Sequence, residues 1–348
     1  MAFTTINKSS LHFNTKLFTG TGSSNAITGV GFQPDLVWIK NRATTGNHAL
    51  FDVINGVTKY VNSNTTYALQ TSAQTLTAFG TDGFTVGTSA DLNGNGNNIA
   101  SWNWKAGGTA STNNDGDNAC SLSANATAGF SISTHTVPNV GAGQYTIGHG
   151  LGKKPKCVIT KQISTTGNFQ TYFEGIGTEN QQYLQLNSTA ALANHSGLWG
   201  NGMTTSVVGL SNTALSSGTT AITYSFAEIT GYSKIGTYTG NGNVDGTFLY
   251  TGFKPAWILF KEASQSGQSW YIWDTTRDDN GNPLEEYIAV DGNAAEGGSG
   301  STYMDYNSNG VKMRDTGTYL NGSGQTYVYM AFAEAPLVGS NNVPCTAR

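Results

Sequence analysis

The feature that most constrains the fold is a motif that occurs three times with the same internal spacing. Each copy contains Gly-x-x-Pro, and a lysine stands six residues after the proline. The three copies are Gly31, Pro34 and Lys40; Gly152, Pro155 and Lys161; and Gly252, Pro255 and Lys261. Self-similarity at a period of roughly 100–120 residues is too long for a solenoid unit and predicts complete domains in tandem.

The sequence around the motif repeats as well. Extended runs lead to it at residues 13–19, 130–137 and 232–239, and alternating aromatic segments close the copies at 100–104, 222–226 and 328–332. Asp-Gly and Asn-Gly pairs between alternating runs are typical of β-hairpins. We therefore expect an all-β protein with roughly seven to nine short strands per copy, arranged as a sandwich or barrel.

The motif itself predicts a loop that enters a central strand. Glycine permits positive φ, and proline can begin a strand where no N–H is needed. Residues 35–39 and 256–260 form nearly continuous apolar runs, which is typical of a strand buried on both faces. We expect each motif lysine to end its strand with the ammonium group in water, in a structural rather than a binding role.

These patterns define the expected domain organisation. An N-terminal arm at 1–10 precedes repeat 1 at 11–108, and a linker at 109–127 leads to repeat 2 at 128–229. Repeat 3 follows at 230–336, and a tail at 337–348 ends the sequence. The linker is rich in Ala, Gly, Ser, Asn and Thr, so a long excursion at a sheet edge is the alternative.

Composition excludes several classes of partner. Charged residues make up 11% of the chain, the net charge is -4, and no run of Lys or Arg occurs, so a nucleic-acid partner is not expected. The first residues lack the features of a signal peptide, and no stretch has the ~18 apolar residues of a membrane span. We expect a soluble protein made in a cytoplasm, with a composition more typical of a protein built into a particle than of a cytosolic enzyme.

Metal and cofactor motifs are weak. Cys120, Cys157 and Cys345 are widely spaced, and neither they nor the histidines show zinc-ligand spacing. The segments 115–118 and 278–282 are rich in the oxygen ligands that hard cations prefer, but neither has the 12-residue loop with a terminal Glu. No cofactor is predicted, and calcium at 278–282 stays open as an alternative to simple Asx turns.

Catalytic motifs are lacking too, and we expect no enzyme. No Gly-x-Ser-x-Gly, P-loop or nucleotide fingerprint stands in a suitable context. An acidic residue does recur after an aromatic run, as Asp52, Glu174 and Asp274. A structural hydrogen bond or a rim contact explains this recurrence more simply than catalysis.

Aromatic residues offer the best candidate binding surface. Most of them should pack in the core because they alternate along strands. A platform that stacks on sugars is the functional alternative, and its candidate residues are Trp270, Tyr271, Trp273, Asp274, Arg277 and Tyr303.

Several segments resemble a known family. Residues 29–42, 13–20, 82–87 and 331–336, with the ending 346–348, are similar to marine bacteriophage virion proteins that are common in cyanophages and of tail-fibre type. The resemblance is weaker in copy two, which has Lys153 and Thr160 within its motif segment. It implies a concanavalin-like or jelly-roll sandwich and a place on the virion surface. It assigns no role to individual residues.

The functional expectation combines these points. The first hypothesis is a non-enzymatic virion surface protein, a short tail-fibre or appendage subunit that binds a host receptor or glycan. The second is a capsid decoration or adaptor protein that binds neighbouring virion subunits. A glycan-cleaving enzyme is a third hypothesis. Homo-oligomerisation is expected from fibre families, unless the three copies already form a pseudo-trimeric surface in one chain.

Overall fold

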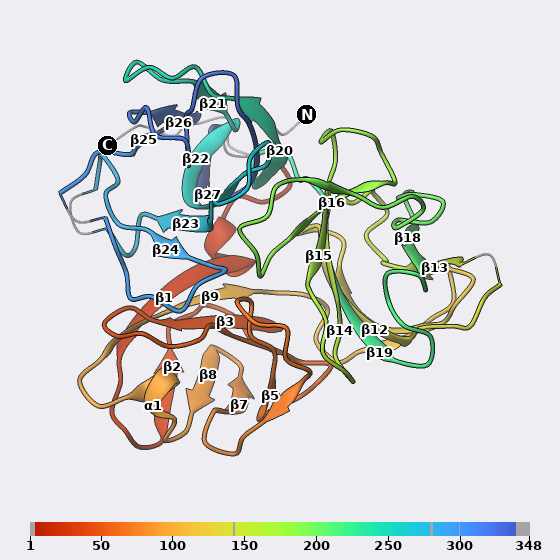
Figure 1. Cartoon of the computed structure of the whole chain (residues 1–348). Coiled ribbons are helices and arrows are strands. Elements are labelled where there is room, and N and C mark those ends of the chain that lie inside the picture. Colours follow the sequence, from red (N-terminus) through yellow and green to blue (C-terminus); the bar gives the residue numbers. More distant parts are fainter. Residues whose placement is uncertain (1–3, 142, 279–280, 299, 339–348) are drawn as a thin grey trace.

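The computed structural model describes residues 4–141, 143–278, 281–298 and 300–338. The protein is nearly all-β and contains several sheets. Figure 1 shows three lobes around a common centre, one for each copy of the motif. Among the described residues, no helix has the length and hydropathy needed to span a membrane.

Copy one forms two main sheets. The central sheet has the strand order β1-β9-β3-β4 and the peripheral sheet has the order β2-β8-β7. The bounds are β1 Phe13–Thr19, β2 Asn25–Thr28, β3 Leu36–Asn41, β4 Ala49–Asp52, β7 Leu76–Gly80, β8 Gly83–Val86 and β9 Asn98–Trp104. Two short elements and one small hairpin complete it: the 3-10 turn η1 Ser9–Leu11, the helix α1 Ala90–Asn93, and β5 Lys59–Tyr60 paired with β6 Gln70–Thr71.

Copy two has the same arrangement with additional strands. Its central sheet has the order β10-β11-β12-β19-β14-β15-β16-β17, and β13 pairs with β18 in the peripheral sheet. The bounds are β10 Ser111–Asn113, β11 Cys120–Asn125, β12 Phe130–Thr136, β13 Gln144–Gly148, β14 Cys157–Gln162, β15 Gln170–Phe173, β16 Gln182–Gln185, β17 Ala193–Asn194, β18 Val207–Ser211 and β19 Thr220–Phe226.

Copy three repeats the pattern again. Its central sheet has the order β20-β27-β22-β23-β24, and its peripheral sheet has the order β21-β26-β25. The bounds are β20 Ser233–Thr239, β21 Phe248–Tyr250, β22 Phe253–Glu262, β23 Trp270–Asp274, β24 Ile288–Ala289, β25 Met304–Asn307, β26 Gly310–Met313 and β27 Thr326–Pro336.

The strand order of the central sheet is the same around the motif in each copy. In every copy the opening strand pairs with the closing strand, which pairs with the motif strand, which pairs with the strand after it. The motif glycines have φ of 92° at Gly31, 65° at Gly152 and 79° at Gly252, so each occupies the left-handed region that the sequence predicted for it. The register places Phe13, Phe130 and Ser233 opposite the last aromatic residues of the closing strands.

The three central sheets bury one face each in a shared core. Its aromatic members come from every copy, because Trp104, Phe226 and Phe332 all lie in the same cluster of buried side chains. The Trp104 ring lies 5.5 Å from that of Trp257 and 6.4 Å from that of Phe226, measured between ring centroids. The copies are therefore packed around one centre, and their mutual contacts are part of the hydrophobic core.

The other face of each central sheet packs on its own peripheral sheet. Along β3, Leu36 and Trp38 point into the shared core, whereas Val37 and Ile39 point into a separate core of copy one. Copies two and three have separate cores of the same kind. Burial on both faces is the physical reason for the unbroken apolar run after each motif proline.

The predicted linker is part of a sheet. Residues 111–113 form β10 and residues 120–125 form β11, and β11 pairs with β12 over Ser121↔Thr134 to Asn125↔Phe130. The excursion at a sheet edge, which the sequence left open, is therefore the arrangement observed. In the N-terminal arm, Ile6 is buried in the shared core. Most of the predicted tail, at 339–348, lies outside the described residues.

The prediction for the motif lysines was wrong in one respect. Lys40, Lys161 and Lys261 are fully buried, so their ammonium groups do not reach water. Each donates to backbone carbonyls instead: Lys40 to Asn41 O at 2.7 Å, Lys261 to Glu262 O at 2.7 Å, and Lys161 to Gly167 O. The preceding copies help to cover the ammonium groups, since Asn293 O and Thr189 O lie 3.5 Å from those of Lys40 and Lys261, and carbonyl oxygens replace the missing water.

Burial makes these lysines sensitive to pH. It lowers the pKa of Lys40, Lys161 and Lys261 to about 8 from a normal value of 10.5. Between these two values the unfolded chain binds more protons than the folded one, so the lysine contribution to stability increases as the pH rises through this window. We expect the free energy of unfolding of the wild type to rise relative to that of Lys161→Met from pH 7 to about pH 9.5, measured by urea denaturation. A difference between the two proteins that does not change with pH would contradict this.

Candidate functional site

Each copy contacts the preceding one in the same cyclic sense. The twelfth residue after each motif proline is a glycine whose N–H donates to a carbonyl of the preceding copy. The three bonds are Gly46 to Asn293 O at 2.8 Å, Gly167 to Thr66 O at 2.8 Å and Gly267 to Thr189 O at 2.9 Å. The protein thus has three pseudo-equivalent seams, which we call the 1–2, 2–3 and 3–1 seams after the copies that they join.

The outer part of the 1–2 seam is closed by the segment between copies one and two. The Gly107 N–H donates to Ser123 Oγ at 3.0 Å, and the Gly108 N–H donates to Asp35 Oδ2 at 3.1 Å. Burial raises the pKa of Asp35. The hairpin of β10 and β11 therefore lies against the opening strand of copy two and the end of copy one.

The 2–3 seam is closed by charge pairs. Glu228 Oε2 lies 3.2 Å from Lys156 Nζ, and its Oε1 lies 2.9 Å from Lys234 Nζ of copy three. Glu174 approaches Lys154 at 3.2 Å and Lys156 at 3.6 Å. These side chains are partly exposed, so the pairs contribute little to stability. They do occupy the space between the copies.

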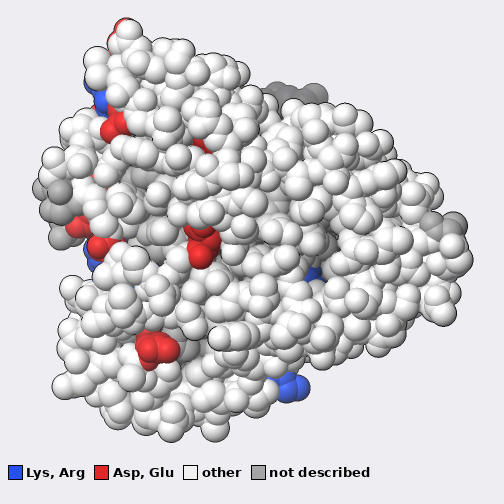
Figure 2. Space-filling model, viewed as in Figure 1, with Lys and Arg blue, Asp and Glu red and all other residues white. Residues whose placement is uncertain are grey.

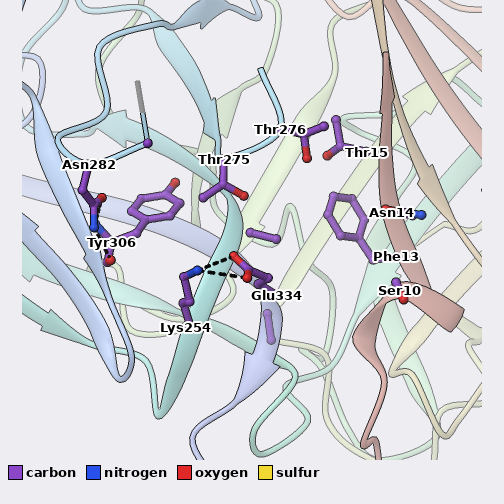
Figure 3. A pocket seen from close by; sticks show the side chains of 13 residues that line it. Ser10, Phe13, Asn14, Thr15, Lys254, Thr275, Thr276, Asn282, Tyr306 and Glu334 are labelled. Atoms are coloured by element: carbon purple, nitrogen blue, oxygen red, sulfur yellow. Dashed lines mark hydrogen bonds and ion pairs between the residues drawn. The ribbon is translucent and has the colours of Figure 1, made fainter. Parts of the chain in front are cut away.

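The 3–1 seam is open. A cleft of about 680 Å³ lies between β1 of copy one and the ends of β22, β23 and β27 of copy three. Figure 3 shows side chains of β1 on one wall and Asn282, Tyr306 and Thr275 on the other. Between the walls, Lys254 and Glu334 form an ion pair at 2.8 Å.

Sequence differences at equivalent positions explain the opening. The backbone bonds from Thr275 to Ala256 and from Glu174 to Lys156 are equivalent, so copy three has alanine and threonine where copy two has a Lys–Glu pair. On the facing strand, Asn14 takes the place of Lys234. Five charged side chains lie in the 2–3 seam, and only two of the equivalent positions in the 3–1 seam are charged, Lys254 and Glu334. The space that the other three side chains fill in the 2–3 seam is therefore left free in the 3–1 seam.

The floor of the cleft carries a polar group in an unusual place. Thr15 occupies the position of Ile132 and Ile235, both of which lie in the shared core. The Thr15 side chain is 7% exposed and lines the cleft, and its Oγ1 has no hydrogen-bond partner among the described residues. A buried hydroxyl without a partner costs stability, and a ligand in the cleft could satisfy it.

The other end of the 3–1 seam contains a separate network of charges. Arg277 Nε lies 2.5 Å from Asp274 Oδ2, and its Nη1 lies 2.5 Å from Glu296 Oε1. Arg42 of copy one pairs with the same Glu296 at 2.6 Å and with Glu286 at 3.1 Å. Copies one and three have no direct chain connection here, so this network joins the first and last copies.

Most of the predicted aromatic platform lies in the interior. Trp270, Trp273 and Arg277 are fully buried, and Asp274 and Tyr303 are 1% and 8% exposed. Trp273 packs in the separate core of copy three, while Trp270 lies in the shared core. Tyr271 is partly buried against the Tyr287 ring. These side chains therefore form no exposed surface for stacking, because alternation along β23 points both faces into a core.

The recurring acidic residue has a structural role in two copies. Trp102 Nε1 donates to Asp274 Oδ2 at 3.0 Å, and Tyr224 OH donates to Asp52 Oδ2 at 3.3 Å. Both bonds join a copy to the preceding one. In copy two the register places Phe173, not Glu174, at this position, and the facing residue of copy three is Met330. The structural interpretation is confirmed for two copies, and Glu174 belongs to the 2–3 seam instead.

The described residues contain no group of three or more His, Cys, Asp or Glu side chains that could hold a metal. The possible calcium segment 278–282 includes residues 279 and 280, which lie outside the described part, as does Cys345. Cys120 and Cys157 are buried free thiols, and burial raises the pKa of Cys120 to about 11.

The sequence did not predict the cleft, and none of the residues that line it belongs to the predicted aromatic platform. A signal was present in the aligned repeats, since Lys156 and Glu174 in copy two align with Ala256 and Thr275 in copy three. Recognising it required the strand register, which shows that these positions face another copy.

Comparison with known proteins gives a family but no activity. No curated protein and no solved structure matches the chain significantly. One family model, described as a domain of unknown function, matches residues 8–336, which include all three copies and all three seams. The chain therefore belongs to the DUF7483 family.

Proposed function

We propose that this chain is a non-enzymatic binding protein of a phage virion surface, a short tail-fibre or appendage subunit. The three copies serve as a rigid scaffold, and the 3–1 seam binds a host receptor or glycan. The observation that carries the proposal is the difference among the seams: two are closed by the chain itself, while the third holds a cleft of about 680 Å³. Ligand sites typically have volumes of about 300–1,000 Å³.

The surface and the fold are compatible with this role. On the face in Figure 2, charged side chains are isolated among uncharged ones. Such a surface suits recognition by shape and neutral hydrogen bonds more than steering by long-range charge. We further propose that each pair of sheets is a sandwich of the jelly-roll or concanavalin-like kind, as the resemblance to marine phage virion proteins implies.

The first test is the location of the protein. We expect gold-labelled antibodies against the purified protein to mark the tail or an appendage of intact particles from the phage that carries this gene. Labelling of the head would favour the decoration or adaptor function. Particles without label, at an antibody dose that detects the purified protein on a grid, would contradict a virion role.

The second test closes the cleft with groups that the protein already uses. The triple variant Asn14→Lys, Ala256→Lys, Thr275→Glu recreates the charge pairs of the 2–3 seam around the native Lys254 and Glu334. We expect the labelled wild-type protein to bind host cells and this variant to lose at least tenfold in affinity, because its side chains fill the cleft. The loss should occur without a change in melting temperature beyond a few degrees, since partly exposed pairs contribute little.

The matched control is the reverse exchange at the 2–3 seam. Lys234→Asn, Lys156→Ala, Glu174→Thr changes the same residue types and should leave cell binding intact. Equal binding by wild type and both variants would show that the 3–1 cleft is not the receptor site.

A separate observation favours the adaptor function as the second candidate. Phe248 and Tyr250 lie on the same face of β21 and are 44% and 55% exposed, and nearby in the chain Val244 is 64% exposed. Exposed large apolar side chains on one strand are typical of a protein–protein contact. A Phe248→Ser, Tyr250→Ser variant that binds cells normally but fails to join particles would support this role for copy three.

A further inference from the structure

We propose that the ligand of the 3–1 seam is an extended polypeptide strand, which adds to the outer edge of β1 inside the cleft. This inference rests on the proposed use of the cleft as a binding site and names the chemical class of its ligand. The partner supplies main-chain N–H and C=O groups, and its side chains are small where they face the cleft walls.

The backbone of β1 presents free hydrogen-bonding groups at the cleft. The Lys105 N–H donates to His12 O at 2.9 Å, and the register runs from Phe13↔Trp104 to Thr19↔Asn98. In an antiparallel pair the bonding direction alternates along a strand. The N–H and C=O groups of Asn14 therefore point to β9, and those of Phe13 and Thr15 point away from it. Phe13 and Thr15 both line the cleft, and β1 has no second strand neighbour among the described residues.

In the other two seams, the equivalent edge forms hydrogen bonds with another part of the chain. In copy two, β11 pairs with the equivalent edge through Asn125↔Phe130 and Ser123↔Ile132. In copy three, the Ile235 N–H donates to Glu228 Oε2 at 3.4 Å. Thr15 is the equivalent of Ile132 and Ile235. Of the three edges, one is paired with a strand and one is capped by a carboxylate, whereas no described segment pairs with the β1 edge.

The strand β11, which pairs with the equivalent edge in copy two, indicates what kind of peptide would bind to β1. The strand β11 has the sequence Cys-Ser-Leu-Ser-Ala-Asn, in which small residues predominate. Gly107 packs closely on the backbone of Ala124, where an added Cβ would lie 2.6 Å from Ala124 O. A strand fits this narrow space because its main chain supplies the hydrogen bonds. In peptide addition at a sheet edge, these bonds give affinity, and alternate side chains of the peptide give specificity.

The experiment uses displayed peptides and two variants of the full chain. A yeast-displayed library of random octapeptides, to which the β11 sequence is added, is selected on wild-type protein and counter-selected on the triple variant that closes the cleft. We expect enrichment of peptides that bind the wild type at least tenfold more tightly than the variant. Hydrogen exchange of the wild type with the best peptide should then slow at the amides of Phe13 and Thr15, and no such protection should appear with the triple variant.

Two single substitutions separate main-chain pairing from recognition of the hydroxyl. Thr15→Pro removes an N–H that points away from β9, so β1 can stay in its sheet, and peptide affinity should fall at least tenfold. Thr15→Ile removes the hydroxyl but keeps the backbone, and peptide affinity should change less than threefold. Equal peptide affinity for wild type and Thr15→Pro would overturn strand addition, whether or not the peptides bind in the cleft.

A saccharide arm distinguishes failure of this inference from failure of the proposed function. A panel of neutral and acidic oligosaccharides is tested against wild type, the triple variant and Thr15→Ile. Saccharide binding that both variants lose, with no peptide enrichment, would refute the strand and leave the binding function in place. Absence of peptide, saccharide and cell binding alike would refute both.

Discussion

Replacing Arg277 by methionine is expected to lower the free energy of unfolding by about 3–5 kcal/mol, because it leaves the buried Asp274 carboxylate without its cation. Arg277 is fully buried, and it pairs with Asp274 and Glu296 at 2.5 Å each. Methionine is of comparable length, so the cavity is small and the loss reports on charge. Guanidinium denaturation monitored by tryptophan fluorescence measures it, since Trp102 lies within the network.

The control for Arg277 is the equivalent position in copy one. Asn55 follows Asp52 as Arg277 follows Asp274, and it donates from Nδ2 to Asp52 Oδ2 at 2.7 Å. Asn55→Ala removes a neutral donor only, so its cost should be about 1–2 kcal/mol. If the two variants lose equal stability, the charge network has no special part in joining copies one and three.

Replacing Trp104 by alanine is expected to cost about 3–5 kcal/mol and to destabilise all three copies together. Its ring contacts aromatic rings of copies two and three, including Phe130, Phe226 and Phe332. Calorimetry should show one transition that moves to lower temperature as a whole. Three independent domains would instead show a loss confined to one of several transitions.

A core residue of copy one alone provides the comparison for Trp104. Phe51 is fully buried in the separate core of copy one, away from the shared core. Phe51→Ala should cost a similar amount of free energy, and hydrogen exchange should rise first in copy one. An equally local effect of Trp104→Ala would show that the shared core does not couple the copies.

The repeat and its strands could be predicted from the sequence because they depend on local chemistry. The spacing of Gly31, Pro34 and Lys40 fixes where a strand begins, and the alternation of aromatic residues fixes where the last strand lies. The packing of the three copies around one centre followed from the sequence only as an alternative to homo-oligomerisation. The apolar run at residues 35–39 shows that both faces are buried, but it does not say that the second face meets two other copies.

The cleft was missed for the same reason. Asn14, Ala256 and Thr275 border the cleft because of the residues that they face in another copy. Those neighbours are set by the way the three copies pack together. The aromatic candidates Trp270 and Trp273 failed because richness in tryptophan is shared by binding platforms and by cores. The burial of the lysines was not predicted because the motif does not show that a neighbouring copy covers the end of the strand. Asn293 O and Thr189 O, which lie 3.5 Å from the ammonium groups of Lys40 and Lys261, belong to the preceding copies.

The cyclic packing of the copies has a consequence for stoichiometry. In a trimer of identical subunits, every groove between subunits occurs three times, and a mutation that alters one alters all. Here the three positions are covalently linked and encoded separately, so each groove can diverge while the centre that they share stays constant. Among the described residues, a hairpin closes the groove between copies one and two, ion pairs close the groove between copies two and three, and the groove between copies three and one keeps a cleft. A ligand of that cleft should bind once per chain, which titration calorimetry would report directly.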